Sequence, residues 1–130
     1  MSATLVDTQA LLWLLDGDAK LSSPALARIA EPASELFFSY ASVWKIAIKH
    51  GKGKLTLPEP PEPFLLKHLT LNKVRLLPIS IGSIFMAGTL PQGQHKDPFD
   101  RLIAAQCLRY DLTLVSSDKA FDAYGVRRVW

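Results

Sequence analysis

Short apolar runs along the chain alternate with longer segments that have the residue spacing of helices. The run Leu36-Phe37-Phe38-Ser39 has no polar alternation, which is typical of a strand buried on both faces. Similar runs predict a strand ending at Leu5-Val6 and further strands over 74–79, 112–115 and 126–129. Strands that alternate with helices predict an α/β domain with a mostly parallel central sheet flanked by helices.

Local signals indicate where these helices begin and end. Ser22-Ser23-Pro24 and Asp97-Pro98 each place a capping side chain before a first-turn proline, and Gly51 is suited to close a helix. Helices are expected over 10–15, from 22 to before 32, and over 42–50, 64–71, 80–87, 97–110 and 118–124. The polar segments 52–63 and 88–96 are expected to be loops.

Composition agrees with one domain spanning 1–130 and limits the cellular setting. The 130 residues are 48% hydrophobic and 21% charged, which is enough apolar material for a core. The single cysteine, Cys107, cannot form an internal disulfide, so a reducing compartment fits best. No apolar run approaches the roughly 20 residues of a membrane span, and the first residues lack a signal-peptide layout. We therefore expect a cytoplasmic protein with no membrane association.

Four aspartates are expected at one edge of the sheet. Asp7 directly follows the first strand, Asp118 follows the fourth strand, and Asp97 and Asp100 lie in the first turn of the long helix. Sites in parallel sheets form at the carboxyl ends of the strands. Converging carboxylates are costly unless a cation neutralises them, and Mg²⁺ prefers such ligands. Metal-assisted phosphodiester hydrolysis is the chemistry that would follow.

Each aspartate also has a structural interpretation that the residues alone leave open. Asp97 before Pro98 suits a helix cap, and Asp100 would favour the helix dipole. Asp118 could cap the following short helix. Asp7 is harder to explain in this way, because a buried carboxylate beside an apolar strand needs a partner.

Five segments, in order and at suitable spacing, resemble PIN-domain toxins of the VapC type. They are VDTQALLW, SVWKIAIKHGKGKL, DPFDRLIAAQ, LTLVSSDKAF and the ending YGVRRVW, which together run through nearly the whole chain. The resemblance implies an Mg²⁺- or Mn²⁺-dependent endoribonuclease that cuts a structured RNA. It also implies a homodimer that a VapB-like antitoxin neutralises.

The same resemblance implies roles for individual residues. Asp7, Asp100 and Asp118 match the first, third and fourth acids of the family's catalytic metal site. Ser116 matches the hydroxyl residue two positions before the fourth acid, and Thr8 is expected to support Asp7 by a hydroxyl or backbone hydrogen bond. Asp97 matches an additional acid, either beside the site or as an occasional ligand.

One position departs from the family pattern. The chain has Trp44-Lys45-Ile46 where the family usually has Trp-Glu-Ile, so Lys45 replaces the second acid. At about 4 Å and an effective dielectric of 20, opposite unit charges interact by about 4 kcal/mol, so this ammonium would compete with a weakly bound Mg²⁺. We expect weakened or absent metal binding and impaired catalysis. In the alternative, Lys45 turns towards solvent or phosphate and a three-aspartate site still works.

The remaining candidates concern RNA and partner binding. Lys49, Lys52 and Lys54 belong to a basic stretch suited to RNA phosphates, although Lys52 and Lys54 could equally be part of a solvated lysine surface. The three tryptophans, Trp13, Trp44 and Trp130, have apolar neighbours and are expected in the core. The alternative function is a PIN-like protein that binds RNA or antitoxin without cleavage. A phosphoacceptor domain is disfavoured, because no acid follows a central strand at 36–39 or 74–79.

Overall fold

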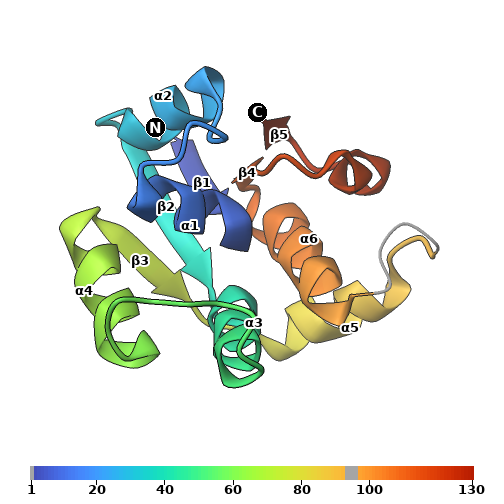
Figure 1. Cartoon of the computed structure of the whole chain (residues 1–130). Coiled ribbons are helices and arrows are strands. Elements are labelled where there is room, and N and C mark those ends of the chain that lie inside the picture. Colours follow the sequence, from blue (N-terminus) through green and yellow to red (C-terminus); the bar gives the residue numbers. More distant parts are fainter. Residues whose placement is uncertain (1, 93–96) are drawn as a thin grey trace.

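The chain folds around a central sheet of parallel strands. The computed structural model describes residues 2–92 and 97–130. The five strands in it are β1 (Ser2–Val6), β2 (Ser34–Ser39), β3 (Val74–Leu77), β4 (Thr113–Val115) and β5 (Arg128–Val129). They lie in the order β3-β2-β1-β4-β5, and each neighbouring pair is parallel (Figure 1). The expected α/β class with a parallel central sheet is confirmed.

Helices cover both faces of this sheet. They are α1 (Thr8–Asp16), α2 (Ser23–Ala30), α3 (Tyr40–Gly51), α4 (Pro61–Leu71), α5 (Ile81–Thr89), α6 (Pro98–Tyr110) and the 3₁₀ helix η1 (Lys119–Tyr124). One core cluster contains apolar residues of α1, α2 and α4, and the other contains those of α5, α6 and η1. Helix α3 contributes Ala41 to one cluster and Ile46 to the other, so it packs between the two cores.

The central strand shows why the sheet needs cover on both faces. In β1, Thr4, Leu5 and Val6 are all buried. Successive side chains of a strand point to opposite faces, and accordingly Leu5 belongs to one core cluster and Val6 to the other. Leu5 is paired with Phe37 of β2 on one side and Leu114 of β4 on the other.

The capping signals of the sequence act as expected. Ser22 Oγ accepts a hydrogen bond from the backbone N–H of Ala25 at 3.2 Å, and Asp97 Oδ1 accepts one from Phe99 at 2.9 Å. Helix α1 ends at Gly17, whose φ of 64° lies in the left-handed region that favours glycine. These local signals explain why the main helices were predictable.

Several boundaries differ from the expected ones. Strand β3 ends at Leu77 and not at 79, because Pro78 has no N–H to donate to a neighbouring strand. Helix α4 begins at Pro61, within the expected loop 52–63, because the first turn of a helix tolerates proline. The expected helix over 118–124 is a 3₁₀ turn, and β5 is shorter than 126–129. The last four residues of the expected loop 88–96 lie outside the described residues.

The parallel arrangement brings distant parts of the sequence to one edge of the sheet. Asp7 follows β1, the segment 116–118 follows β4, and α3 begins directly after β2. Helix α6 packs against α3, so its first turn comes to the same edge. In the part of the chain that the structure describes, no helix is long and apolar enough to cross a membrane.

Candidate active site

Asp7 is held at the junction of β1, β4 and α1. It is the N-cap of α1, and its Oδ1 accepts a hydrogen bond from the backbone N–H of Thr8 at 2.8 Å. Its Oδ2 accepts a hydrogen bond from Ser116 Oγ, beyond the end of β4, at 2.7 Å. Both carboxylate oxygens are therefore fixed, and the side chain cannot turn without breaking one of these bonds.

Ser116 also fixes the position of Asp118. The backbone N–H of Asp118 donates to Ser116 Oγ at 3.1 Å, so one hydroxyl bonds to Asp7 and to the backbone of Asp118 at the same time. Asp118 caps η1, and its Oδ1 accepts from the N–H of Ala120 at 3.0 Å. Ser116 therefore links Asp7 directly to the backbone of Asp118.

Thr8 supports Asp7 through its backbone and not through its hydroxyl. Its backbone N–H donates to Asp7, whereas its Oγ1 donates to Ser42 Oγ at 2.7 Å. Both hydroxyls are buried, and the bond joins the start of α1 to the first turn of α3. Of the two modes expected for Thr8, the backbone hydrogen bond is the one observed.

Lys45 points into the acidic edge of the sheet. Its Nζ lies 3.1 Å from Asp97 Oδ2 and 3.4 Å from Asp100 Oδ1. The side chain of Lys45 is 21% exposed and that of Asp100 is 14% exposed, so this ion pair is largely shielded from water. The alternative in which Lys45 turns towards solvent is not the arrangement in the structure.

The charges of Lys45 and Asp118 both act on Asp7. The pKa of Asp7 is raised, because burial of its carboxylate outweighs the hydrogen bonds from Ser116 and Thr8 and the attraction of Lys45. The charge of Asp118 raises it further. Burial alone would lower the pKa of Lys45, but Asp100 and Asp97 together outweigh it, and the net pKa of Lys45 is raised. Lys45 is therefore a protonated cation that contacts Asp97 and Asp100 and whose charge also acts on Asp7.

The residues as they lie do not fit a bound divalent metal. Among residues 2–92 and 97–130, no three histidine, cysteine, aspartate or glutamate side chains are grouped so that they could hold a metal ion. The oxygens of Asp97 and Asp100 that would face such an ion face the ammonium of Lys45. A positive charge at this point repels a divalent cation, so no catalytic step through a metal follows from this arrangement.

Asp97 caps α6, which was one of its expected roles, and it also pairs with Lys45. Its Oδ1 caps α6, and its Oδ2 pairs with Lys45. Asp100 lies in the first turn of α6, and its Oδ1 is the second carboxylate oxygen beside the ammonium.

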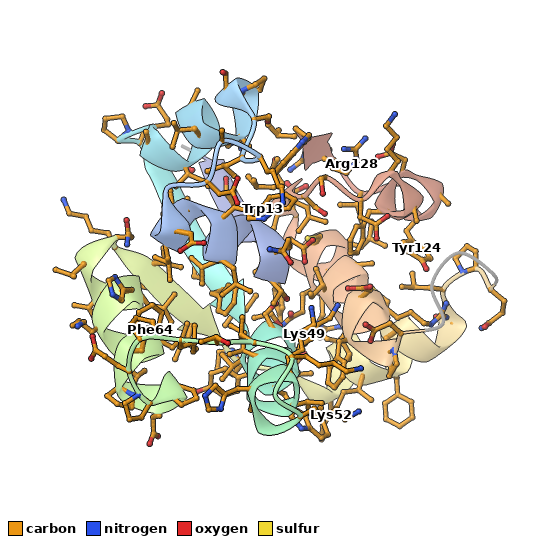
Figure 2. All side chains as sticks on the ribbon, viewed as in Figure 1. Trp13, Lys49, Lys52, Phe64, Tyr124 and Arg128 are labelled. Carbon is orange, nitrogen blue, oxygen red and sulfur yellow. The ribbon has the colours of Figure 1, made fainter. Side chains whose placement is uncertain are left out.

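The candidate RNA-binding lysines lie towards the end of α3 and beyond it. Lys49 is one turn after Lys45 on the same face of the helix and is half-buried, whereas Lys52 and Lys54 are exposed. Figure 2 shows Lys52 at the lower end of α3, away from the sheet. A positive strip thus leads from the acidic edge towards solvent.

The sequence interpretation was wrong for Trp44. This side chain is 60% exposed, and its ring packs edge-on against Phe99 at 5.2 Å between ring centroids. Trp13 and Trp130 are partly buried and pack against each other at 5.7 Å. The apolar neighbours of Trp44 in the sequence gave no indication that the helix turns this position outwards.

Arg128 is a residue at this edge that the sequence analysis missed. Its Nη1 donates to the backbone carbonyl of Ser116 at 3.2 Å, and its guanidinium also binds Asp122. The charge of Asp118 is among the causes that raise the pKa of Arg128, after the hydrogen bond to Asp122, which is the largest. The only signal was its place in the ending YGVRRVW, which gives no spacing relative to the acids.

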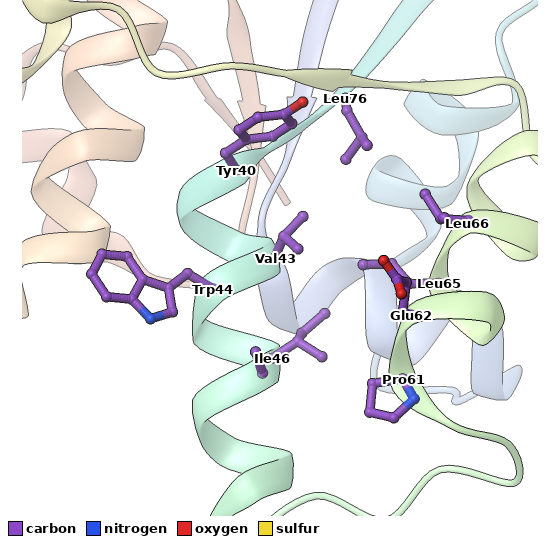
Figure 3. Close-up of a pocket in the computed structure, with 10 residues that line it drawn as sticks. Tyr40, Val43, Trp44, Ile46, Pro61, Glu62, Leu65, Leu66 and Leu76 are labelled. Carbon is purple, nitrogen blue, oxygen red and sulfur yellow. The ribbon is translucent and has the colours of Figure 1, made fainter.

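The four aspartates do not line the apolar groove between α3 and α4. An apolar groove of about 430 Å³ lies between α3 and α4, lined by Tyr40, Trp44, Leu65 and Leu66 among others (Figure 3). Its single charged lining residue is Glu62. This groove is mostly apolar and suits an apolar partner surface.

Comparison with known proteins identifies the family. Residues 4–126 match the family model of the PIN domain, so the chain belongs to the PIN domain family. None of the curated protein sequences matches the chain.

Solved structures share this fold at low sequence identity. A chain of the VapBC2 structure from Rickettsia felis, bound to a DNA fragment from its promoter, has a TM-score of 0.71 and 16% identity; the match covers 97% of this chain and 96% of that one. VapBC-1 from nontypeable Haemophilus influenzae gives 0.65 and 18%, covering 97% and 96%. A toxin-antitoxin complex from Klebsiella pneumoniae gives 0.55 and 15%, covering 88% of each chain.

Proposed function

We propose that this chain is the toxin component of a type II toxin–antitoxin pair, of the VapC type, and that its partner is a VapB-like antitoxin in the cytoplasm. Its membership of the PIN domain family supports this, as does the fold that it shares over most of its length with chains of VapBC complexes. The exposed apolar groove between α3 and α4 provides surface for a partner chain.

The chemistry that we propose for this class of site is endonucleolytic cleavage of a structured RNA. Asp7, Asp100 and Asp118 would be the ligands of Mg²⁺ or Mn²⁺, which supplies a polarised phosphoryl oxygen and an activated water when it is bound. Asp97 would support Asp100 from the same helix turn. Lys49, Lys52 and Lys54 would bind phosphates of the RNA.

In this chain we propose that the cleavage activity is impaired. One observation carries this: Lys45 Nζ lies 3.1 Å from Asp97 and 3.4 Å from Asp100, in the position where the family has an acid. The site thus has a cation in place of a carboxylate, and the cation is paired with Asp100, one of the proposed ligands, and with Asp97.

The same observation favours a second candidate function, a protein that binds RNA or antitoxin without cutting. If Lys45 blocks the metal site, the positive strip of Lys49, Lys52 and Lys54 and the apolar groove are still available for binding. The two candidates differ in whether the remainder of the catalytic site is intact.

The substitution Lys45→Glu separates these candidates. At position 45, this substitution replaces a cation that repels a divalent ion with an anion that attracts it. Two unit charges 4 Å apart interact by about 4 kcal/mol at an effective dielectric of 20. We expect Lys45→Glu to cleave RNA in Mn²⁺ at least about tenfold faster than the unchanged chain, since 1.4 kcal/mol corresponds to a factor of ten. Its expression should also slow growth of the host.

Two variants control this experiment. Lys20→Glu makes the same charge change at an exposed position outside the acidic edge and should leave the rate as it is. Lys45→Glu/Asp118→Asn should remove the gained cleavage. A folded Lys45→Glu protein that binds Mn²⁺ and leaves RNA intact would contradict the impaired-nuclease proposal and favour the binding-only protein.

A further inference from the structure

In the ion pair of Lys45 with Asp100 both side chains are shielded, whereas in the pair of Arg128 with Asp122 only the guanidinium is, because Asp122 is 55% exposed. In the pairs Lys67–Glu59 and Arg127–Asp111, both side chains are more than two-fifths exposed. Exposed pairs of this kind contribute little to stability, because water and salt screen them. Lys45 and Asp100 are 21% and 14% exposed, so their interaction is much less screened.

The surroundings of Lys45 require a positive charge. Asp97 and Asp100 lie within 3.4 Å of its ammonium, and Asp7 lies close enough for Lys45 to stabilise its charged form. Asp118 adds a fourth negative charge that acts on Asp7. Removing one partner from a shielded pair leaves the other charge uncompensated, which costs far more than losing an exposed pair.

Lys45 also joins two elements mechanically. Its backbone belongs to α3, and its carboxylate partners are the N-cap residue of α6, Asp97, and Asp100 in the first turn of that helix. The same two helices are also joined by the edge-on contact of Trp44 with Phe99. The ammonium of Lys45 is therefore held in place by two carboxylates from the neighbouring helix.

We propose that Lys45 is a built-in counter-ion of the carboxylate site: its ammonium neutralises the aspartates in place of a divalent metal, so the chain folds without metal and excludes it. The aspartates are not grouped for a metal ion while the ammonium lies between them, and loss of the charge at position 45, even without gain of an acid, then lets them draw together around a divalent cation. This deepens the proposed function, since it concerns regulation of the same site, but it requires neither RNA nor antitoxin.

A neutral substitution separates this inference from restoration of the family's acid. Lys45→Gln keeps a long polar side chain and supplies no negative charge. Any Mn²⁺ that it gains is held by the aspartates already present, once the competing ammonium has gone. Lys45→Met gives the same loss of charge with a different shape, in case the glutamine variant does not fold.

The test uses the full chain, Mn²⁺ alone as the probe, and two measurements: isothermal titration and thermal unfolding. For the unchanged protein we expect no saturable Mn²⁺ binding and no change in Tm on adding Mn²⁺. For Lys45→Gln without metal we expect a Tm at least about 3 °C lower. Mn²⁺ should bind this variant with saturation and raise its Tm.

Matched variants make each outcome decisive. Lys67→Gln removes the charge of an exposed ion pair and should behave as the unchanged protein does. Lys45→Gln/Asp100→Asn should lose the response of Tm to Mn²⁺. Equal Mn²⁺ binding by the unchanged chain and Lys45→Gln would overturn the inference, and so would an unaltered, Mn²⁺-insensitive Tm in both neutral variants. Failure of RNA cleavage or antitoxin binding would leave these measurements unaffected.

Discussion

At the scale of single residues, the acidic edge is organised by side chains that each make two interactions. Ser116 Oγ donates to Asp7 and accepts from the backbone of Asp118, and each Asp97 oxygen has a different partner. Lys45 lies between two carboxylates of α6. Any substitution here therefore changes two contacts, and conservative variants are needed to separate them.

Asp7 gives a prediction about pH. Its pKa in the folded protein is raised, chiefly by burial, so the folded state holds this proton to higher pH than the unfolded chain does. Its contribution to stability is therefore present below the ordinary aspartate pKa and is lost as the pH rises through the folded-state pKa. Asp7→Asn cannot ionise and still offers an oxygen to cap α1. We expect it to gain stability relative to the unchanged protein as the pH rises from 3.5 to 7.

Urea unfolding at both pH values in a metal-free buffer measures this effect. Asp16→Asn, at an exposed position near the end of α1, is the matched control and should show no such trend. If the stability difference between Asp7→Asn and the unchanged chain stays constant across this range, or moves in the opposite direction, burial of Asp7 is not what governs its ionisation.

At the scale of elements, the start of α6 combines a helix cap with a site residue. Asp97 Oδ1 caps the helix and its Oδ2 pairs with Lys45, so the two roles separate by substitution. Asp97→Asn keeps an oxygen for the cap and loses the charge, whereas Asp97→Ala loses both. We expect Asp97→Ala to be less stable than Asp97→Asn by about 1 kcal/mol, the usual value of a capping side chain.

Chemical denaturation of both variants tests this difference. Ser22→Ala removes the cap of α2, outside the acidic edge, and gives the cost of a cap with no ion pair involved. Equal stabilities of the alanine and asparagine variants at position 97 would mean that the capping bond contributes nothing, and that only the pair with Lys45 matters.

The elements also show what sequence reasoning can and cannot reach. Apolar runs such as 36–39 and caps such as Asp97-Pro98 are local signals, and they predicted the parallel fold and most of the helices. Strand β3 ends early because proline has no N–H at position 78. Whether the sheet needs a donor there depends on the neighbouring strand, and the local sequence does not show it. Likewise, no local signal in the sequence predicted that β5 would be limited to Arg128–Val129.

The site was predictable only in part, for the same reason. The resemblance identified Asp7, Asp100, Asp118 and Lys45, because those positions lie in ordered motifs. That Lys45 pairs with Asp97 and Asp100 depends on the packing of α3 against α6. The contact of Arg128 with Ser116 and the outward position of Trp44 depend on tertiary packing too, which no periodicity reveals.

At the scale of the whole molecule, the sheet order brings the acids together on one edge and leaves apolar surface on the helices. Helix α5 has an unpaired stripe in which Ile81 is 73% exposed and Phe85 is 72% exposed, with Ile84 on the same face. Such a stripe favours association, and we propose that it belongs to the interface of a homodimer. The stripe is distinct from the residues at the acidic edge.

Charged substitutions on α5 test this homodimer. Burying a phenylalanine side chain contributes about 1.5–3 kcal/mol, and a two-fold interface counts each side chain twice. We therefore expect Phe85→Lys and Ile81→Lys each to weaken self-association at least about tenfold, as measured by sedimentation equilibrium. Leu71→Lys places the same charge at a leucine of α4 that is 69% exposed, and it should leave the association unchanged. A chain that stays monomeric at high concentration, or that responds equally to all three substitutions, would rule out α5 as a specific dimer surface.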